Sequence, residues 1–317
     1  MSNPTLRKII STELTIPEHL LERIIQRAPY SYKVYTIPKK SRGRRTIAQP
    51  AKETKYIQHW LINNIFNTLP IHEAATAYKL GSSIKKNIST HANNDFISKF
   101  DFKTFFTSIK ADHLRQHFKR HLKFNFDESD INDILRLCCI RNRNDEPLCL
   151  SIGAPSSPIL SNSIMYEFDL EVTSWCKKNN FTYTRYADDL TFSTKTKETS
   201  NTIEPAIRNI IRALEYPLLR FNRKKTIHLS KKNQRRITGL ILTNEGKVSI
   251  GRSRKREISA LIHKYSHQAL PDEEVLRLQG LLGFAKDAEP IFISRMRSKY
   301  GHAIIEDLLK KRAPANL

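Results

Sequence analysis

The sequence predicts an α+β fold in which a small antiparallel sheet carries helices on one face. The main observation is the order of patterns in the middle of the chain, where strand, helix, strand-turn-strand, helix and strand follow one another. A second observation is that the region beyond residue 250 is helical and basic. A third is that no repeat, low-complexity tract or Pro/Gly/Ser linker divides the 317 residues, which are enough to bury a substantial core.

The N-terminal region predicts two helices and a hairpin. Residues 15–18, Thr-Ile-Pro-Glu, match a capping box and predict a helix over residues 20–28. Residues 30–50 alternate around a Ser-Arg-Gly turn at residues 41–43, which predicts a basic β-hairpin. Residues 53–69 carry apolar side chains at helical spacing, and we expect this helix in the core.

The middle of the chain predicts the sheet. A strand pattern over residues 95–101 ends at an acidic residue, and two apolar, β-prone runs flank a pair of aspartates within residues 183–194. The other expected elements are helices over residues 111–122, 127–141, 164–178 and 202–215, a basic strand over 218–230 and a strand pair over 235–250.

The charge of the chain indicates a polyanionic partner. Its 54 Lys and Arg against 31 Asp and Glu give a net charge of +23. Such an excess causes self-repulsion unless a polyanion relieves it, so nucleic acid is the first partner to consider. A basic membrane-surface protein would show a cationic amphipathic helix or a long apolar run, and the sequence shows neither, so we expect no membrane partner.

The N-terminal segment indicates the cellular compartment, and the spacing of the cysteines indicates their chemical state. The N-terminal segment MSNPTLRKIIS lacks the apolar core of a secretory signal, so we expect a cytoplasmic protein. The cysteines have no CxxC spacing and no flanking histidine in ligand register, which favours reduced thiols over a zinc site. They are Cys138, Cys139, Cys149 and Cys176.

The pair Asp188-Asp189 in YTRYADDLTFST predicts a metal site. Adjacent carboxylates repel and lose hydration if their hairpin packs into a core, and a multivalent cation holds both ionised. If the strand over residues 96–101 lies beside the hairpin, Asp101 joins the pair. Three carboxylates from two strands can hold two divalent ions that clamp the attacking and leaving oxygens of a phosphoryl transfer. Mg²⁺ suits these hard oxygen ligands.

Several motifs in one order carry a family resemblance. FDFKTFF, GAPSSPILSN, YADD, FNRKKT and RRITGLIL follow one another, and together they resemble the reverse transcriptases over nearly the whole chain. The resemblance implies a right-hand polymerase: an N-terminal helix and fingers over residues 1–95, a palm over 96–240 with about 121–150 returning to the fingers, and an RNA-binding thumb over 241–317.

The resemblance also implies roles at the metal site. Asp101, Asp188 and Asp189 would bind two Mg²⁺ ions, with the backbone carbonyl of Phe102 as an extra ligand. The alternative for Asp101, a simple helix cap, would not explain the downstream pair. Lys225 matches a lysine that could protonate the pyrophosphate leaving group, although the neighbouring Lys224 is an alternative.

Nucleotide selection falls on three further positions. Phe106 lies where the family has its sugar gate, and its ring would collide with a ribose 2′-OH. Arg45 lies where a cation faces the incoming triphosphate, with Arg44 as a rival. Gly153 opens the second palm motif, and Ile152 before it replaces a glutamine that is frequent in the family.

Within the family, the chain resembles the bacterial retron reverse transcriptases. Asn87 to His91 corresponds to their NAxxH element, and Ile237-Thr238-Gly239 to their VTG element, each with one apolar residue changed. This resemblance implies that the enzyme copies part of a structured non-coding RNA into short single-stranded DNA (msDNA), primed from an internal guanosine 2′-OH. It also implies anti-phage defence together with an effector protein.

The basic region at residues 220–256 supports an RNA partner. It contains thirteen Lys and Arg, among them Arg252, Arg254 and Lys255, and a single acidic residue, Glu245. Such a surface suits an RNA stem or RNA–DNA duplex that is recognised through backbone and shape. The alternatives are another bacterial reverse transcriptase, diversity-generating or group II intron-like, and a nucleic-acid-binding scaffold for an effector protein.

Three histidines recur on one predicted helix. His113, His117 and His121 have the i, i+4, i+8 spacing that can bind zinc. No acidic or Cys partner is in register, however, and the neighbouring Arg and Lys oppose a metal. We interpret the histidines as a polar face near nucleic acid.

Overall fold

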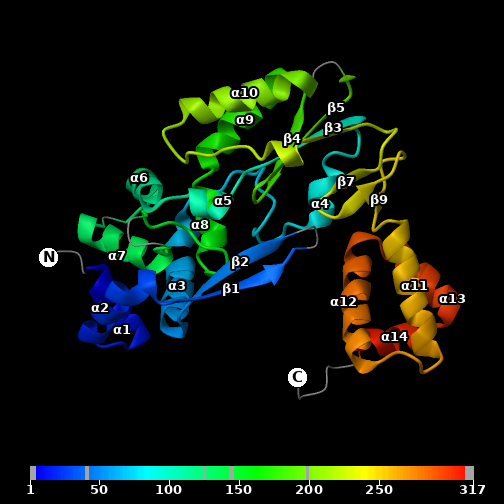
Figure 1. Ribbon diagram of the computed structural model, residues 1–317, viewed down its shortest axis with the longest axis horizontal. Helices are drawn as coiled ribbons and strands as arrows, with labels where there is room; N and C mark the ends of the chain where they lie inside the picture. Colours follow the sequence, from blue (N-terminus) through cyan, green and yellow to red (C-terminus); the bar gives the residue numbers. More distant parts are fainter. Residues whose placement is uncertain (1–4, 40–42, 125, 143–145, 198–199, 311–317) are drawn as a thin grey trace. The chain divides into compact units, whose positions relative to one another are not determined.

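The computed structural model describes residues 5–39, 43–124, 126–142, 146–197 and 200–310, and Figure 1 shows its elements. The chain forms two compact units. The first comprises Met1–Leu80, Lys99–Leu190 and Asn201–Ile227, and the second comprises Gly81–Ser98, Thr191–Ser200 and His228–Leu317. Within the described residues, no helix is long and apolar enough to cross a membrane.

The N-terminal helices of the first unit pack on one another and on a helix from much later in the chain. Leu6 of α1 (Leu6–Leu14) is fully buried, and its backbone N–H donates to a carboxylate of Asp130 (3.0 Å) in α7 (Glu128–Cys138). The other elements of this region are α2 (Glu18–Arg27), η1 (Ala28–Tyr30), α3 (Lys52–Asn64) and η2 (Phe66–Thr68).

The predicted capping box is wrong. Thr15 adopts φ 55°, and its N–H donates to Ser11 as the left-handed C-cap of α1, a helix that the sequence reading did not include. Helix α2 then begins at Glu18 after Pro17, without a side-chain cap. Pro17, with its fixed φ angle, occupies the N-cap position of α2. Thr15 lies two residues earlier and ends the preceding helix instead.

The predicted hairpin is confirmed. Strands β1 (Tyr32–Pro38) and β2 (Arg44–Pro50) pair antiparallel, from Tyr32 opposite Pro50 to Pro38 opposite Arg44 (Figure 1). Two residues of the expected turn, 41 and 42, lie outside the described residues. The N–H of Ala48 in β2 donates to the carbonyl of Ile152 (2.8 Å), which brings the segment after α7 against the base of the hairpin.

The sheet that carries the acidic residues has the strand order β4-β5-β3-β6. Its strands are β3 (Phe96–Asp101), β4 (Thr182–Tyr186), β5 (Asp189–Thr194) and β6 (Ile227–Leu229), and β4 and β5 form a hairpin. The helices of the same region are α5 (Phe105–Ser108), α6 (Ala111–His121), α8 (Ser157–Ser163), α9 (Tyr166–Lys178) and α10 (Ser200–Ala213).

The expected basic strand over residues 218–230 is largely wrong. The segment contains a single turn of 3₁₀ helix, η4 (Arg223–Lys225), before the short strand β6. The N–H of Asn222 donates to the carbonyl of Asp101 (2.7 Å), and the N–H of Lys225 donates to the carbonyl of Asn222 (2.8 Å). The backbone therefore turns back at the end of β3 instead of continuing as a strand.

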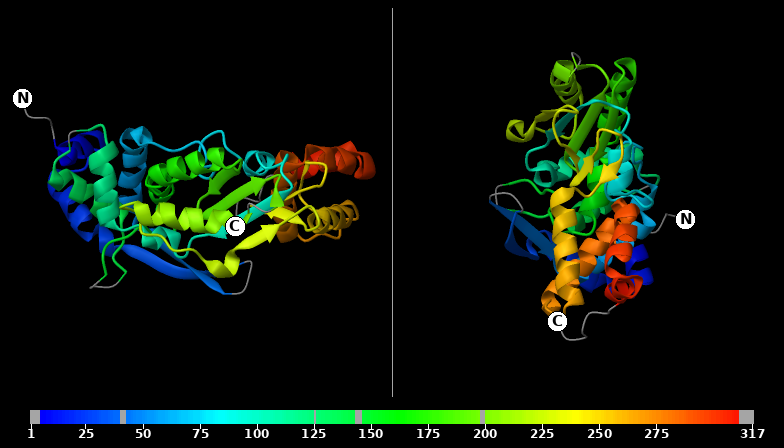
Figure 2. Two further views of the ribbon diagram at one scale, coloured as in Figure 1. Left: turned by 90° about the horizontal axis from the view of Figure 1, so that it is seen from above. Right: turned by 90° about the vertical axis from the view of Figure 1, so that its right-hand side faces the viewer.

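The second unit joins a small sheet to a helical region. Its apolar core includes Ile88, Ile237 and Leu278, all fully buried. Both views of Figure 2 show its C-terminal helices gathered side by side, as the helical pattern beyond residue 250 predicted. The elements are α4 (Ile84–Ser89), antiparallel β7 (Arg235–Ile237), β8 (Leu240–Leu242) and β9 (Val248–Ser249), and α11 (Arg252–Ser266), α12 (Asp272–Ala288), α13 (Pro290–Tyr300) and α14 (His302–Lys310).

Candidate active site

Three carboxylates converge at one end of the four-stranded sheet. Asp101 ends β3, Asp188 lies in the turn between β4 and β5, and Asp189 begins β5; their ligand oxygens lie within 4.8 Å of one another. Ala187 takes φ 55°, which makes the two-residue turn tight. The N–H of Phe102 donates to the carbonyl of Asp188 (3.2 Å) and joins the turn to β3.

The electrostatics of this cluster call for a cation. Asp101 is 3% exposed, and the other two are partly buried. Burial and the charge of Asp101 raise the pKa of Asp188, and burial and the charge of Asp188 raise the pKa of Asp189 to about 6. Clustered carboxylate oxygens are ligands for hard divalent ions, so the residues present fit a divalent metal.

Lys225 lies directly on the carboxylates. Its Nζ is 2.6 Å from Oδ2 of Asp101, while the side-chain amide of Asn222 donates to Oδ1 (3.2 Å). Burial opposes the charge on Lys225, but the hydrogen bond with Asp101 and the three carboxylates raise its pKa. Lys224 instead lines a neighbouring cavity of about 610 Å³ that also contains Lys103 and Arg220.

The two predicted arginines differ in their partners. Arg44 is held along the hairpin, because its Nε donates to Oγ1 of Thr36 (2.7 Å) and its Nη2 to the carbonyl of Thr36 (3.0 Å). Arg45 is exposed, and its charge opposes the rise in the pKa of Asp188, so its field acts at the carboxylates. This difference favours Arg45 as the cation that faces the site.

Phe106 and Gly153 have distinct structural settings. Phe105 is buried, whereas Phe106 in α5 is partly exposed and packs edge-on against it, with ring centroids 5.5 Å apart. Gly153 has φ 124°, and a Cβ there would lie 2.9 Å from the carbonyl oxygen of Ala48. A side chain at Gly153 would therefore push the motif away from strand β2.

A buried ion pair that the sequence reading missed supports the turn. Arg185 and Asp169 are both fully buried, and the guanidinium Nη2 lies 2.6 Å from Oδ2 of Asp169. The same guanidinium donates to the carbonyl of Ala187 (3.1 Å), directly before Asp188. The hydroxyl of Tyr183 donates to Asp169 as well (2.8 Å). The available signal was Arg185 itself, a charged residue in a strand that was expected to pack into a core, because a buried arginine needs a partner.

The residues expected to bind nucleic acid in the second unit lie in two groups. Asn87 of α4 is 3.5 Å from the hydroxyl of Thr238, which forms a left-handed turn with Gly239. His91 is fully buried, and its Nδ1 is 2.7 Å from the hydroxyl of Ser193, so it supports this region from inside.

The basic start of α11 forms the other group. Arg254 donates to the carbonyl of Gly239 (3.3 Å) and stacks on Phe284. Lys255 pairs with Glu289 (2.5 Å), whereas Arg252 is exposed.

Comparison with known proteins defines the class. Residues 37–242 match the family described as "Reverse transcriptase (RNA-dependent DNA polymerase)", and the chain belongs to that family. It is an RNA-directed DNA polymerase, an enzyme that acts on nucleic acid and dNTPs.

Within the family, the chain is a reverse transcriptase of the bacterial retron type. It is 39% identical over 283 residues to the Retron Ec83 reverse transcriptase of Escherichia coli, covering 88% of this chain and 90% of that one. It is also 34% identical over 287 residues to the Retron Ec73 reverse transcriptase of the same species, covering 87% and 89%.

A solved structure shows the same fold. The apo telomerase from Candida Tropicalis superposes with a TM-score of 0.50 at 13% identity, covering 89% of this chain and 63% of that one. The fold is that of a right-hand polymerase with mixed helices and small antiparallel sheets.

Proposed function

We propose that this enzyme copies part of a structured non-coding RNA into short single-stranded DNA, primed from an internal guanosine 2′-OH, in the cytoplasm. The observation that carries its chemistry is the cluster of Asp101, Asp188 and Asp189 with Lys225 on its edge. The supports for the retron reaction are the identity to two retron enzymes and the basic region at residues 220–256. An effector protein in anti-phage defence completes the proposal.

The metal chemistry of the proposal rests on Mg²⁺. Two ions held by the three aspartates and the carbonyl of Phe102 would stabilise the charge on the attacking and leaving oxygens. The carboxylate of Asp101 is held in position by hydrogen bonds from Asn222 and Lys225. Lys225 keeps a proton at its Nζ, where it can be given to pyrophosphate as that group leaves.

The proposal also assigns the domains of the enzyme. Fingers occupy residues 1–95, the palm 96–240 with 121–150 returning to the fingers, and the thumb 241–317. Arg45 faces the triphosphate, and Gly153 keeps the second palm motif close to the hairpin. RNA contacts are assigned to Thr238, Gly239, Arg252, Arg254 and Lys255 of the second unit. Asn87 and His91, which the sequence also predicted to bind RNA, are buried and support this region from inside.

The retron reaction is tested on nucleic acid that co-purifies with the protein from its native operon. The sample is treated with RNase, DNase and a 2′–5′ debranching enzyme, and gel mobilities are compared. We expect a short DNA that survives RNase and shifts after debranching. Unbranched RNA alone, together with normal primer extension on dNTPs, would refute the retron reaction and keep the polymerase.

Exchange of Phe106 for alanine will relax sugar selection. The ring is partly exposed beside Phe105, and its loss removes the steric barrier to a 2′-OH. We expect incorporation of rNTPs relative to dNTPs to rise at least about tenfold, roughly 1.4 kcal/mol of lost discrimination. Primer extension with each nucleotide pool measures the ratio. Phe124→Ala, at an exposed ring, is the matched control, and an unchanged ratio in Phe106→Ala would refute the gate.

Two adjacent lysines allow a paired test of proton donation. Lys225→Gln removes the ammonium that contacts Asp101, and we expect the polymerisation rate to fall by about 10²-fold. Lys224→Gln, one residue away, should lose less than about threefold in rate, within the range of a modest surface change. Single-nucleotide incorporation under single-turnover conditions gives both rates. Equal losses in the two variants would remove the assignment to Lys225.

A further inference from the structure

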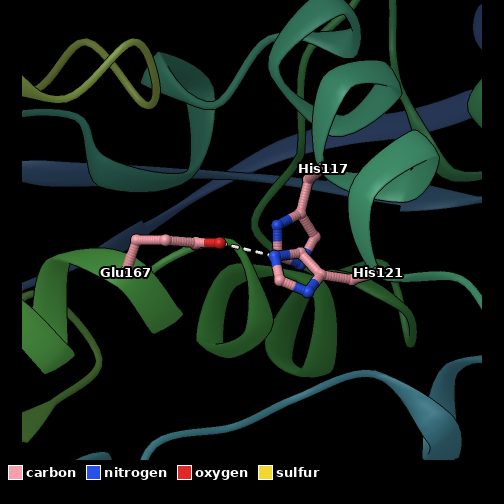
Figure 3. A group of neighbouring side chains, drawn as sticks. All are labelled: His117, His121 and Glu167. Atoms are coloured by element: carbon pink, nitrogen blue, oxygen red, sulfur yellow. Dashed lines mark hydrogen bonds and ion pairs between the residues drawn. The ribbon is translucent and has the colours of Figure 1, made fainter.

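Two histidines and a glutamate meet where α6 ends and α9 begins. His117 and His121 lie one turn apart on α6, and Glu167 lies in the first turn of α9. One ligand atom from each lies within 4.8 Å of the other two, and Figure 3 shows the carboxylate facing both imidazole rings. Nε2 of His121 is 2.5 Å from Oε1 of Glu167. The acidic partner that is absent from α6 itself thus comes from a later helix.

Buried polar atoms in this cluster lack partners. His117 is fully buried, and its Nε2 is 2.7 Å from the hydroxyl of Ser163. Its other nitrogen, Nδ1, has no hydrogen-bond partner, and neither has Oε2 of Glu167, although both atoms are buried. If Nε2–H donates to Ser163, the Nδ1 lone pair is free, which is the arrangement that ligating histidines adopt. Unsatisfied buried polar atoms of this kind are rare, and a bound ion would account for them.

We propose that His117, His121 and Glu167 bind a Zn²⁺ ion, His117 through Nδ1. Two imidazoles and one carboxylate are a donor set that zinc prefers, whereas Mg²⁺ favours oxygen ligands alone. The spacing i, i+4 puts both rings on one face of α6. The side chains of His121 and Glu167 are 19% and 23% exposed, so a fourth position is open to water.

The geometry needs a small adjustment. Tetrahedral zinc with bonds of about 2.0–2.1 Å places its ligand atoms about 3.3 Å apart, so the His121–Glu167 contact of 2.5 Å must open slightly. Burial, together with the nearby His121 and Arg120, lowers the pKa of His117 to about 3, so protons do not compete for this ligand at neutral pH.

The positive charge of Arg120 lies near His117 and would repel a Zn²⁺ ion. Its guanidinium pairs with Glu215 (3.2 Å) and lies over the ring of Tyr216, 5.4 Å from the centroid, so part of its charge is already offset. The site is separate in its ligands from the three aspartates. A bound ion would fasten α6 to the start of α9, the helix whose Asp169 holds Arg185, so its role is structural.

Metal titration of the full-length protein tests the site. Chelator-treated protein in excess Mg²⁺, which occupies carboxylate sites, is titrated with Zn²⁺ against a chromophoric chelator, and with Co²⁺ by visible absorption. We expect one equivalent of Zn²⁺ and the intense bands of tetrahedral Co²⁺. His121→Gln and Glu167→Gln should each weaken Zn²⁺ binding at least tenfold. Ser163→Ala should weaken it by about 10–100-fold, as loss of an outer partner does.

Controls separate this site from the other metal cluster. His59→Gln changes an exposed histidine, and Asp188→Asn disables the aspartate cluster; both should bind Zn²⁺ like the unmodified protein. Circular dichroism checks that each variant is folded. The proposal is overturned if Zn²⁺ binding is unaffected in both His121→Gln and Glu167→Gln, if it is lost in Asp188→Asn, or if no tetrahedral Co²⁺ spectrum appears.

Discussion

Asp188→Asn will reduce DNA synthesis at least about 10³-fold, a loss of roughly 4 kcal/mol of transition-state stabilisation. The residue lies within 4.8 Å of Asp101 and Asp189 through its ligand oxygens, and an amide gives up the negative charge that holds a divalent ion. Primer extension on an RNA template with Mg²⁺ measures the loss. Binding of RNA in a mobility-shift assay should stay unchanged, which separates catalysis from scaffolding.

Controls for this loss come from the surface. Asp112→Asn changes a carboxylate whose side chain is 78% exposed, and its synthesis rate should equal that of the unmodified enzyme. An Asp188→Asn enzyme that retains more than a tenth of its synthesis would contradict the metal role of the cluster. Loss of both synthesis and RNA binding would instead indicate a folding defect.

Loss of a carboxylate from this cluster should lower activity but raise the stability of the folded protein. The pKa of Asp189 is about 6, above the ordinary carboxyl value, so its ionised form destabilises the folded protein at neutral pH. Without divalent ions at pH 7, Asp189→Asn should therefore stabilise the protein by about 1–3 kcal/mol, seen as a higher melting temperature. The gain should disappear below about pH 4, where the carboxyl is protonated in both the folded and unfolded states.

The convergence of the aspartates was predictable because it depends on local rules. A strand that ends in Asp101 and a tight hairpin turn at Asp188 each follow from residue type, and pairing the two strands is enough to bring the carboxylates together. Which of the two lysines, Lys224 or Lys225, contacts Asp101 was not predictable in the same way. It depends on the 3₁₀ turn Arg223–Lys225, which follows the hydrogen bond from the N–H of Asn222 to the carbonyl of Asp101, where a strand was expected.

Contacts between residues far apart in the chain could not be predicted from the sequence either. Spacing on one helix showed His117 and His121 but not Glu167, which is 46 residues further along than His121. Likewise, the capping-box pattern at Thr15 is a local signal that a preceding helix overrode, because the same residue ends α1. Sequence patterns describe single elements, whereas these contacts depend on how elements pack.

The buried pair of Asp169 and Arg185 should give the largest loss of stability. Asp169→Asn leaves the guanidinium buried without its counter-charge, and breaking such a pair costs about 3–5 kcal/mol of unfolding free energy. Glu204→Gln is the matched control, since its pair with Arg208 is partly exposed (side chains 32% and 30%) and should cost less than about 1 kcal/mol. Urea denaturation followed by circular dichroism compares the two.

A double variant shows whether the loss comes from the isolated charge. In Asp169→Leu with Arg185→Met, no charge is left in the interior, so stability should recover by several kcal/mol relative to either single variant. DNA synthesis should not recover with it, because the carbonyl of Ala187 loses the donor that holds the turn before Asp188. Full activity in the double variant would mean that the turn before Asp188 does not depend on the hydrogen bond from Arg185. Equal stability of Asp169→Asn and Glu204→Gln would mean that the buried pair adds no more to the unfolding free energy than an exposed pair does.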